Sequence, residues 1–512
     1  MSENQTLLPD VASALESFTH LEQKIMHYQQ LLGLVQWDLQ SGGTPRKGQA
    51  SRAEAIGALT ADTFELFVSE EMGACLDVLT KPENNQQLDA ESRARVRVAK
   101  KEYDKTKNIP SSMNREFSVL TAKAHHIWEE ARSKNQFSLY EESLTKIVDF
   151  QRQFAEYYGY EGHPYNALLN NYEPGLNVEK LDLLFSDLRQ KTIQLLDRIQ
   201  ASPHKPQKEI FEQKINIEQQ KEFNKFILPK LNFDLDAGRL DESVHPFAIG
   251  LSTGDVRMTT RYLEEDVRSA IFSTMHECGH GLYEQGVHAD YNGTFIQGGA
   301  SMGIHESQSR FLENIVGRSL EFWTYFYEDL KAHFPQHFDQ VSLEEFTRAI
   351  NLSEPSLIRV EADELTYNLH IMIRYEIEKG LIGGQYEVKD LPQIWNEKMQ
   401  DYLGITPSTD SEGVLQDVHW SFGGFGYFPS YCLGNLYAAQ IAHTIKQQIP
   451  DFDQVIANGE FDKIRGWLLE NIHQYGKLYT PGDLIVKVTG EELNAKYLVE
   501  YLEQKYTEVY KL

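Results

Sequence analysis

Apolar residues recur at the spacing of an amphipathic helix through most of this 512-residue chain. The spacing is clear in residues 15–33, 51–68 and 178–202, and it returns over most of the C-terminal half. One segment, 246–262, instead alternates apolar and polar residues around a Ser-Thr-Gly break, which favours a hairpin or short sheet. We therefore expect a mainly α-helical protein with one small β-sheet.

Composition narrows the class of protein. Lys plus Arg number 49 against 76 Asp plus Glu, which gives a formal charge of −27. Such a surface repels phosphate backbones and anionic lipid, so we expect neither nucleic acid nor a membrane as a partner. No apolar run reaches the roughly 18 residues that a membrane span needs. No repeat or low-complexity linker divides the chain, so residues 1–512 are expected to form a single domain.

The N-terminus and the cysteines predict a cytoplasmic protein. The first residues show neither a basic segment nor a continuous apolar segment of a secretory signal. Cys75, Cys278 and Cys432 are too few for a disulfide framework in a chain of this length.

A His-Glu-x-x-His motif is the strongest chemical signal. Asp266 can cap a helix that ends at Gly286, and His276 and His280 then stand one turn apart on one face of that helix. Glu277 can sit beside the water of a bound zinc ion without ligating it. The alternative is two surface histidines without a metal, which the amphipathic setting of the motif disfavours.

A third ligand is expected from a later helix. Glu306 lies in a segment of helical periodicity, far enough beyond His280 for a loop and a returning helix. His305 is a competing ligand. Glu306 can also be read as an ordinary exposed glutamate, like Glu284 and Glu313 nearby.

These residues predict metal-assisted hydrolysis of an acyl bond with Glu277 as the general base. The oxyanion then needs a second donor, and candidates cluster in residues 413–431. Gly423, Gly424 and Gly426 in that segment indicate either a backbone that approaches a ligand closely or a tight turn between core helices.

Recognition of a free terminal carboxylate separates a carboxypeptidase from an endopeptidase, and arginine suits it best. Arg359 and Arg257 are the candidates, although a lone arginine is more often part of a surface ion pair. Spacing alone therefore predicts a zinc peptidase and does not decide between a carboxypeptidase and an endopeptidase.

Several motifs occur together along the chain. They are His-Pro-Phe at 245–247, Asp-Val-Arg-Met-Thr at 255–259, His-Glu-Cys-Gly-His at 276–280, His-Glu-Ser-Gln-Ser-Arg at 305–310, Ile-Arg-Val-Glu-Ala-Asp at 358–363, Gly-Val-Leu-Gln-Asp-Val-His-Trp at 413–420 and Tyr-Glu-Pro-Gly at 172–175. In this order they resemble the carboxypeptidase Taq family of zinc metallocarboxypeptidases. The resemblance implies a clothespin-like fold of two helical lobes around a deep central groove, with the small sheet beside the active site. It also implies a homodimer that removes C-terminal residues with broad specificity and disfavours proline.

By motif position, the resemblance implies His276, His280 and Glu306 as ligands of one Zn²⁺ per chain, with cobalt as an alternative ion, and Glu277 as the base. It implies substrate-binding roles for Arg359, Arg257, His245 and His419, with Arg359 at the terminal carboxylate. Tyr427 becomes the oxyanion donor by analogy with the wider architecture, with Tyr431 and His419 as alternatives.

Two other functions stay in play. A zinc oligopeptidase would cut internal bonds of short peptides and would hydrolyse amidated peptides as well as free acids. A non-catalytic peptide-binding protein would need metal ligands but no base, so the intact Glu277 argues against it.

Overall fold

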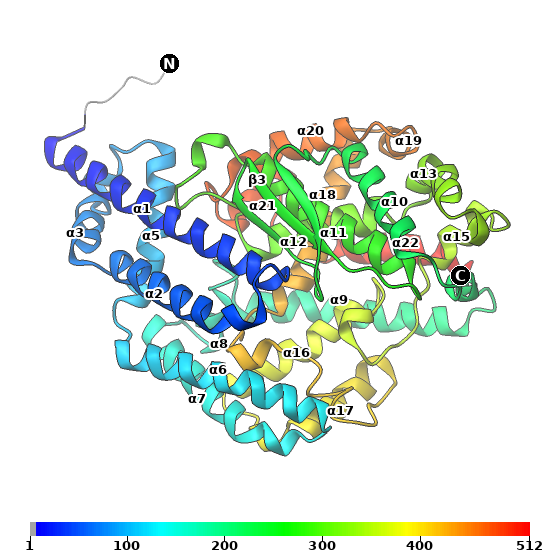
Figure 1. The fold of residues 1–512 in the computed structure, drawn as a ribbon, viewed down its shortest axis with the longest axis horizontal. Helices are drawn as coiled ribbons and strands as arrows, with labels where there is room; N and C mark the ends of the chain where they lie inside the picture. Colours follow the sequence, from blue (N-terminus) through cyan, green and yellow to red (C-terminus); the bar gives the residue numbers. More distant parts are fainter. Residues whose placement is uncertain (1–6) are drawn as a thin grey trace.

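The computed structural model describes residues 7–512 as a mainly helical molecule (Figure 1). The first six residues, which belong to the N-terminal stretch considered for targeting, lie outside the described part. The expectation of a mainly α-helical fold is confirmed.

The helices follow one another along the chain as follows. The first part contains α1 Pro9–Gln40, α2 Gln49–Phe67, α3 Glu70–Leu79, α4 Pro82–Asn85, α5 Ala90–Thr106, α6 Ser111–Ser133, α7 Glu141–Tyr158, α8 Tyr165–Leu169, α9 Val178–Ala201 and α10 Ile217–Lys230. The second part contains α11 Val267–Gly286, α12 Met302–Arg310, α13 Leu320–His333, α14 Pro335–Phe338, α15 Leu343–Ala349, α16 Tyr367–Ile382, α17 Leu391–Leu403, α18 Pro429–Gln448, α19 Phe452–Ala457, α20 Phe461–Asn471, α21 Pro481–Thr489 and α22 Lys496–Tyr510. The three segments with the clearest helical spacing correspond to α1, α2 and α9.

The sheet contains the predicted hairpin and one further strand. Strands β2 (Ala248–Ser252) and β3 (Asp255–Thr260) pair antiparallel, and β1 (Gly238–Glu242) pairs parallel with β3 on its other side. The order in the sheet is β1-β3-β2. Strand β1 could not be predicted because its sequence, Gly-Arg-Leu-Asp-Glu, has a single large apolar side chain and therefore no alternating pattern.

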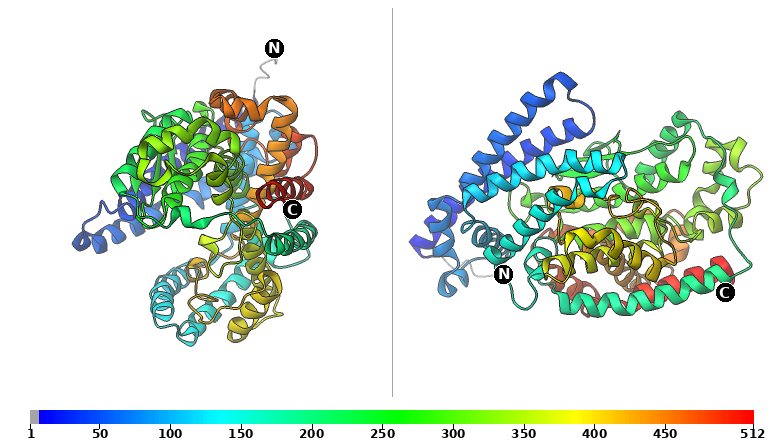
Figure 2. Two further views of the ribbon diagram at one scale, coloured as in Figure 1. Left: turned by 90° about the vertical axis from the view of Figure 1, so that its right-hand side faces the viewer. Right: turned by 90° about the horizontal axis from the view of Figure 1, so that it is seen from below.

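The helices form two groups in space. Figure 2 shows α6, α7, α16 and α17, coloured cyan and yellow, together on one side, with the sheet and most of the other helices on the opposite side. Buried apolar side chains from Ala94 to Tyr510 form one large core cluster. A second, smaller cluster joins α1, α3 and α5, and Phe295 belongs to it.

Glycines bring three central helices and the sheet into close contact. A methyl group on Gly279 of α11 would lie 2.4 Å from the Gln308 carbonyl oxygen of α12, and one on Gly434 of α18 would lie 2.3 Å from Glu306 Cγ of α12. Gly281 of α11 similarly leaves room for Met258 of β3. The absence of side chains at these positions therefore sets how α11, α12 and α18 meet.

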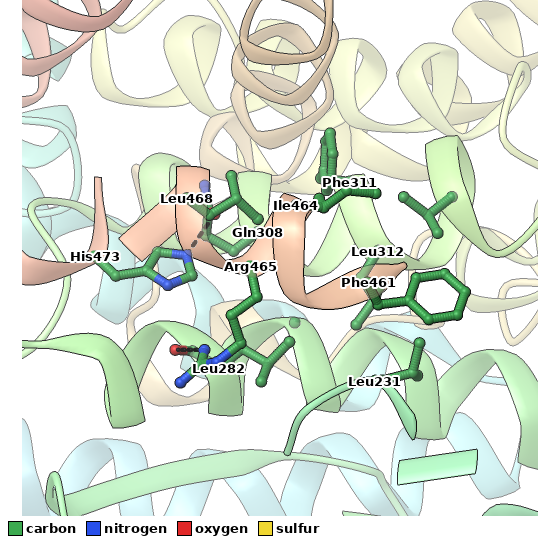
Figure 3. Close-up of a pocket in the computed structure, with 12 residues that line it drawn as sticks. Leu231, Leu282, Gln308, Phe311, Leu312, Phe461, Ile464, Arg465, Leu468 and His473 are labelled. Atoms are coloured by element: carbon green, nitrogen blue, oxygen red, sulfur yellow. Dashed lines mark hydrogen bonds between the residues drawn. The ribbon is translucent and has the colours of Figure 1, made fainter. Parts of the chain in front are cut away.

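A small cavity lies where α11, α12 and α20 meet (Figure 3). Its walls are mainly apolar, apart from Arg465, His473 and Gln308, and the His473 ring hydrogen-bonds Gln308 Oε1 at 2.9 Å. Its volume of about 30 Å³ is that of about one water molecule. It therefore has no room for a peptide.

No helix in residues 7–512 combines the length and the apolar character needed to cross a bilayer. All three cysteines are buried and unpaired, in agreement with the expected lack of a disulfide framework.

Candidate metal centre

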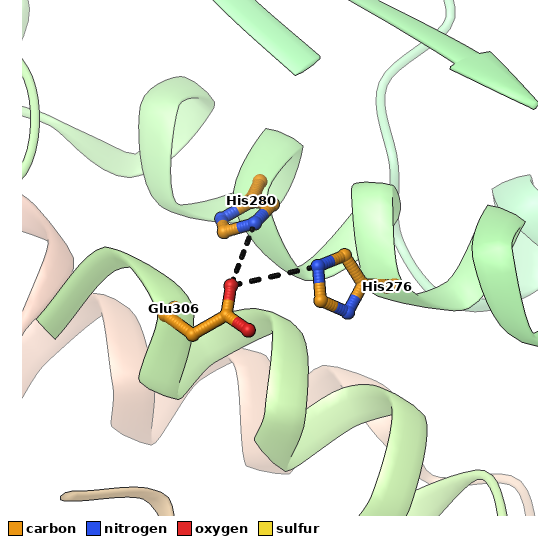
Figure 4. A group of neighbouring side chains, drawn as sticks. All are labelled: His276, His280 and Glu306. Carbon is orange, nitrogen blue, oxygen red and sulfur yellow. Dashed lines mark ion pairs between the residues drawn. The ribbon is translucent and has the colours of Figure 1, made fainter. Parts of the chain in front are cut away.

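Two helices bring together the three residues proposed as metal ligands. Asp266 caps α11 as predicted, since its side chain accepts a hydrogen bond from the Arg268 amide. His276 and His280 of α11 point toward Glu306 of α12 (Figure 4). Glu306 Oε2 lies 3.5 Å from His276 Nε2 and 3.4 Å from His280 Nε2.

This geometry fits a metal ion. Each histidine engages a partner through Nδ1, which leaves Nε2 free to ligate. Tetrahedral bonds of 2.0–2.2 Å place neighbouring ligand atoms about 3.3–3.6 Å apart. Both distances from Glu306 Oε2 to the imidazole nitrogens fall in that range, and all three ligand atoms lie within 4.8 Å of one another, so the three residues fit a zinc-sized ion.

Glu313 orients the first histidine. His276 Nδ1 lies 2.9 Å from Glu313 Oε2, and Arg318 NH2 donates to the other Glu313 oxygen at 3.2 Å. Glu313 lies in a π-helical segment, Phe311–Val316, that continues α12. The wider turn of a π-helix is often found at functional sites. Glu313 is therefore not the exposed glutamate considered from sequence.

His305 and Glu284 stand behind the second histidine. His305 Nδ1 lies 2.6 Å from His280 Nδ1, and His305 Nε2 lies 2.7 Å from Glu284 Oε1. Both ring nitrogens of His305 are thus engaged away from Glu306. His305 had been a competing ligand in the sequence, and here it contacts a ligand instead.

Glu306 is held as an anion. Arg310 Nε donates to Glu306 Oε1 at 2.6 Å, and Ser309 Oγ donates to Glu306 Oε2 at 3.1 Å. Burial raises the pKa of the carboxyl, but Arg310 and the two histidines outweigh burial and hold the pKa well below its usual value. Burial also lowers the pKa of His280 to about 4, so that ring is neutral and able to ligate at neutral pH.

Glu277 has the environment of a proton acceptor. Its side chain is buried, and Oε2 has no hydrogen-bond partner. Burial raises the pKa of Glu277 to about 7, against the lowering effect of His276. A buried carboxylate oxygen without a partner is costly, and a catalytic role is one explanation for such a group.

Arg359 belongs to a buried cluster of charges. Its Nε donates to Asp417 Oδ1 at 2.8 Å, and its NH1 donates to the Tyr367 hydroxyl at 3.0 Å. Arg374 Nε donates to the other Asp417 oxygen at 2.8 Å. Two guanidinium groups thus share one carboxylate, and the cluster keeps a net positive charge that an anionic group could neutralise.

The aromatic candidates gather at the start of α18. The Tyr427 ring lies 5.1 Å from Tyr172 and 5.2 Å from Tyr431 between centroids. His419 Nε2 lies 3.3 Å from the Tyr431 hydroxyl, and burial lowers the pKa of His419 to about 3. Burial, followed by the charge of Glu306, raises the pKa of Tyr427 to about 12, so the phenol keeps its proton.

The glycine segment forms a turn against the protein backbone. Gly426 has φ +89°, and a methyl group on it would lie 2.7 Å from the Leu168 carbonyl oxygen. Its amide donates to Glu378 Oε2 at 2.9 Å. These contacts support a tight turn at Gly426 and explain how Tyr427, the next residue, is held.

Arg257 and His245 belong to the small sheet and its loop, and not to the helices that carry the metal ligands. Arg257 makes two hydrogen bonds to Asp255, at 2.7 and 2.9 Å, and its guanidinium lies 5.9 Å from the Trp37 ring. Since Val256 and Met258 of β3 are buried in the main core, Arg257 points from the opposite face of the sheet into a cavity of about 600 Å³ beside α1. His245 is exposed in the loop before β2.

Comparison with known proteins identifies the family. The family model described as carboxypeptidase Taq (M32) metallopeptidase matches residues 17–506. The chain belongs to this family. It is 48% identical to Carboxypeptidase 1 of Bacillus subtilis (strain 168) over 497 residues, which cover 97% of this chain and 99% of that protein. It is 40% identical to Thermostable carboxypeptidase 1 of Pyrococcus furiosus over 484 residues, which cover 94% of this chain and 95% of that protein.

The fold agrees with the sequence match. The crystal structure of M32 carboxypeptidase from Deinococcus radiodurans R1 superposes with a TM-score of 0.94 at 35% identity, over 98% of this chain and 100% of that chain. The protein is therefore a metallocarboxypeptidase with an M32 fold, and His276, His280 and Glu306 form its metal-binding group.

Proposed function

We propose that this protein is a zinc-dependent carboxypeptidase that holds one Zn²⁺ per chain on His276, His280 and Glu306. The observation that carries the proposal is the buried carboxylate of Glu277, whose Oε2 has no hydrogen-bond partner. Glu277 lies on the same helix as His276 and His280, whose Nε2 atoms are available to ligate a metal ion. When bound, zinc supplies a Lewis acid that polarises a carbonyl and lowers the pKa of water to about 7. Cobalt is an alternative ion for the same ligand set.

Glu277 acts as the general base. With a pKa raised to about 7 by burial, the Glu277 carboxylate can take a proton from the attacking water at neutral pH and return it to the leaving amine. Burial within the protein limits competition from bulk solvent for that proton.

Tyr427 donates to the oxyanion that forms when water adds to the scissile carbonyl. Its phenol is protonated at neutral pH, because burial and then the charge of Glu306 raise the Tyr427 pKa to about 12. A neutral donor that is fixed before the reaction stabilises developing charge without reorganising. Tyr431 and His419 are the alternative donors, and they contact each other.

Arg359 holds the terminal carboxylate of the peptide. Asp417 is shared between Arg359 and Arg374, so the carboxylate does not fully neutralise the two cations. A peptide carboxylate could form charge-assisted hydrogen bonds with the remaining N–H groups of Arg359. Arg257, His245 and His419 remain further substrate-binding candidates. Arg257 and His245 would contact parts of a substrate that lie farther from the metal centre.

The remaining features follow from family membership. We propose broad specificity for the released residue with proline disfavoured, a homodimer, and a single domain of two helical lobes around the active-site groove. The large core cluster that runs from Ala94 to Tyr510 supports the single domain.

A peptide ladder read by mass spectrometry tests the proposal. We expect stepwise loss of residues from the C-terminus, abolished by a chelator and restored by Zn²⁺. The same peptide with an amidated C-terminus should resist cleavage. Internal cleavage, or equal hydrolysis of the amidated and free peptides, would instead identify an oligopeptidase.

A further inference from the structure

The two histidine ligands have unequal outer partners. His276 Nδ1 contacts a carboxylate directly, at 2.9 Å from Glu313 Oε2. His280 Nδ1 contacts another imidazole, His305, and the carboxylate of Glu284 lies behind that ring. The proposed mechanism gives no role to His305 or Glu284. Both side chains are nevertheless largely buried, since His305 is 20% and Glu284 is 13% exposed, and His280 beside them is 16% exposed.

Ligation of a metal ion by His280 fixes the direction of the hydrogen bonds that link His280, His305 and Glu284. A neutral His280 that ligates through Nε2 carries its proton on Nδ1. Since two facing ring nitrogens 2.6 Å apart share one proton, His305 Nδ1 must accept it. With Nδ1 accepting, the ring proton of His305 lies on Nε2, which donates to Glu284 Oε1 at 2.7 Å. The chain therefore runs from His280 through His305 to Glu284.

The His305 ring is also held by packing. Its centroid lies 4.7 Å from the His280 ring and 5.2 Å from the Tyr283 ring. A methyl group on Gly299 would lie 2.8 Å from both His305 Cδ2 and Tyr283 Cε1. The protein thus leaves out a side chain at Gly299 so that the two rings can pack, which fixes where His305 meets His280.

We propose that His305 and Glu284 are positioning residues that fix the tautomer and the ring orientation of His280, and thereby set the affinity of the centre for its metal ion. The inference rests on the proposed use of His280 as a ligand. Outer partners of this kind raise the basicity of an imidazole ligand and limit its rotation. His305 and Glu284 do this without binding the ion or the substrate.

Metal titrations of the full-length apo-protein test the inference. Zn²⁺ affinity is measured in competition with a chelating dye, and coordination is followed by the visible spectrum of the Co²⁺-loaded protein. His305→Leu removes both hydrogen bonds and should weaken Zn²⁺ binding by about 10–100-fold. His305→Gln, whose amide can accept from His280 and donate to Glu284, should recover most of the loss. Glu328→Gln is the matched control, because Glu328 is exposed and its ion pair is with Lys331 on the same helix.

Glu284 provides a second, milder series. Glu284→Gln keeps an oxygen that accepts from His305 but removes the charge, so it should weaken Zn²⁺ binding less than Glu284→Ala. If His305→Leu does not fold, this ranking decides the question. Equal affinity in all four variants and the wild type would overturn the inference, and so would equal losses in His305→Leu and His305→Gln.

The Co²⁺ spectrum separates positioning from ligation. A spectrum of unchanged coordination in His305→Leu, at saturating metal, supports positioning, whereas the loss of a ligand would show that His305 binds the ion itself. His280→Ala distinguishes the two proposals. If His280→Ala loses the metal and His305→Leu does not, the positioning role alone fails. If His280→Ala binds Zn²⁺ as the wild type does, the proposed centre fails.

Discussion

Gly434→Ala should disturb the metal centre from the outside. The new methyl group would lie 2.3 Å from Glu306 Cγ, 2.7 Å from Glu306 Cβ and 3.1 Å from the Glu306 carbonyl carbon. Ordinary contact begins at 3.4 Å, so Glu306 or α18 must move by about 1 Å. Glu306 cannot rotate away without losing its hydrogen bonds to Arg310 and Ser309.

A movement of that size exceeds what a metal centre tolerates. Ligand distances in protein metal sites hold to within about 0.2 Å. We therefore expect Zn²⁺ binding to weaken by about 100-fold, at the upper end of the effect of losing an outer partner. Overpacking of the helix contact should also lower the free energy of unfolding by about 1–3 kcal/mol.

Zinc titration against a chelating dye and thermal unfolding of the apo-protein measure the two effects separately. Gly466→Ala is the control: it lies in α20, no other atom lies within 4 Å of the added methyl group, and it should leave zinc affinity unchanged while stabilising the helix by about 0.5–1 kcal/mol. If Gly434→Ala binds zinc and unfolds like the wild type, then α12 and α18 do not meet as closely as described.

Three further substitutions test the chemistry and the electrostatics. Glu277→Gln should keep zinc bound, as measured by metal analysis, while turnover falls by about 10²–10⁴-fold because the base is lost; retained turnover would refute its assigned role. Arg359→Ala should lower kcat/KM on free-acid peptides by about 10–100-fold, from the loss of a charge-assisted hydrogen bond, and should leave any residual hydrolysis of amidated peptides unchanged; equal losses on both would count against the carboxylate clamp. Burial raises the pKa of Glu173 from 4.5 to about 7, so between these pH values the native protein holds a proton that the unfolded chain has released. The free energy of unfolding therefore falls by up to about 3 kcal/mol as the pH rises through that window. Glu173→Gln should reduce the fall in the thermal unfolding midpoint between about pH 5 and pH 7.5. An unchanged pH profile in this variant would contradict the raised pKa.

The sequence predicted what depends on local periodicity. The helix of His276 and His280, its cap at Asp266 and the hairpin at 246–262 all follow from spacing and turn residues, which act over a few positions. The His-His-Glu group was also predictable, because Glu306 lies in a recognisable helical segment.

What the sequence could not predict depends on contacts between distant segments. Glu313 looked like an exposed glutamate because its approach to His276 requires the π-helical turn, which no local pattern indicated. Arg359 and Asp417 pair across 58 positions, and the sequence around either residue does not indicate its partner. The contact of Arg257 with Trp37 of α1 joins residues 220 positions apart, and no local pattern indicated it. In each case the side chain is chosen by tertiary packing.

The division of the apolar interior into a large cluster and a small one has a consequence for local opening. The small cluster joins α1, α3 and α5, while α2 packs against it only through the half-buried Leu66 and Phe67 and has a single buried residue of its own, Thr63. Amide hydrogens of such a helix can exchange through openings that leave the catalytic helices folded. A hydrogen-exchange map should therefore show fast exchange in α2, intermediate exchange in α1 and α3, and the slowest exchange in α11, α12 and α18.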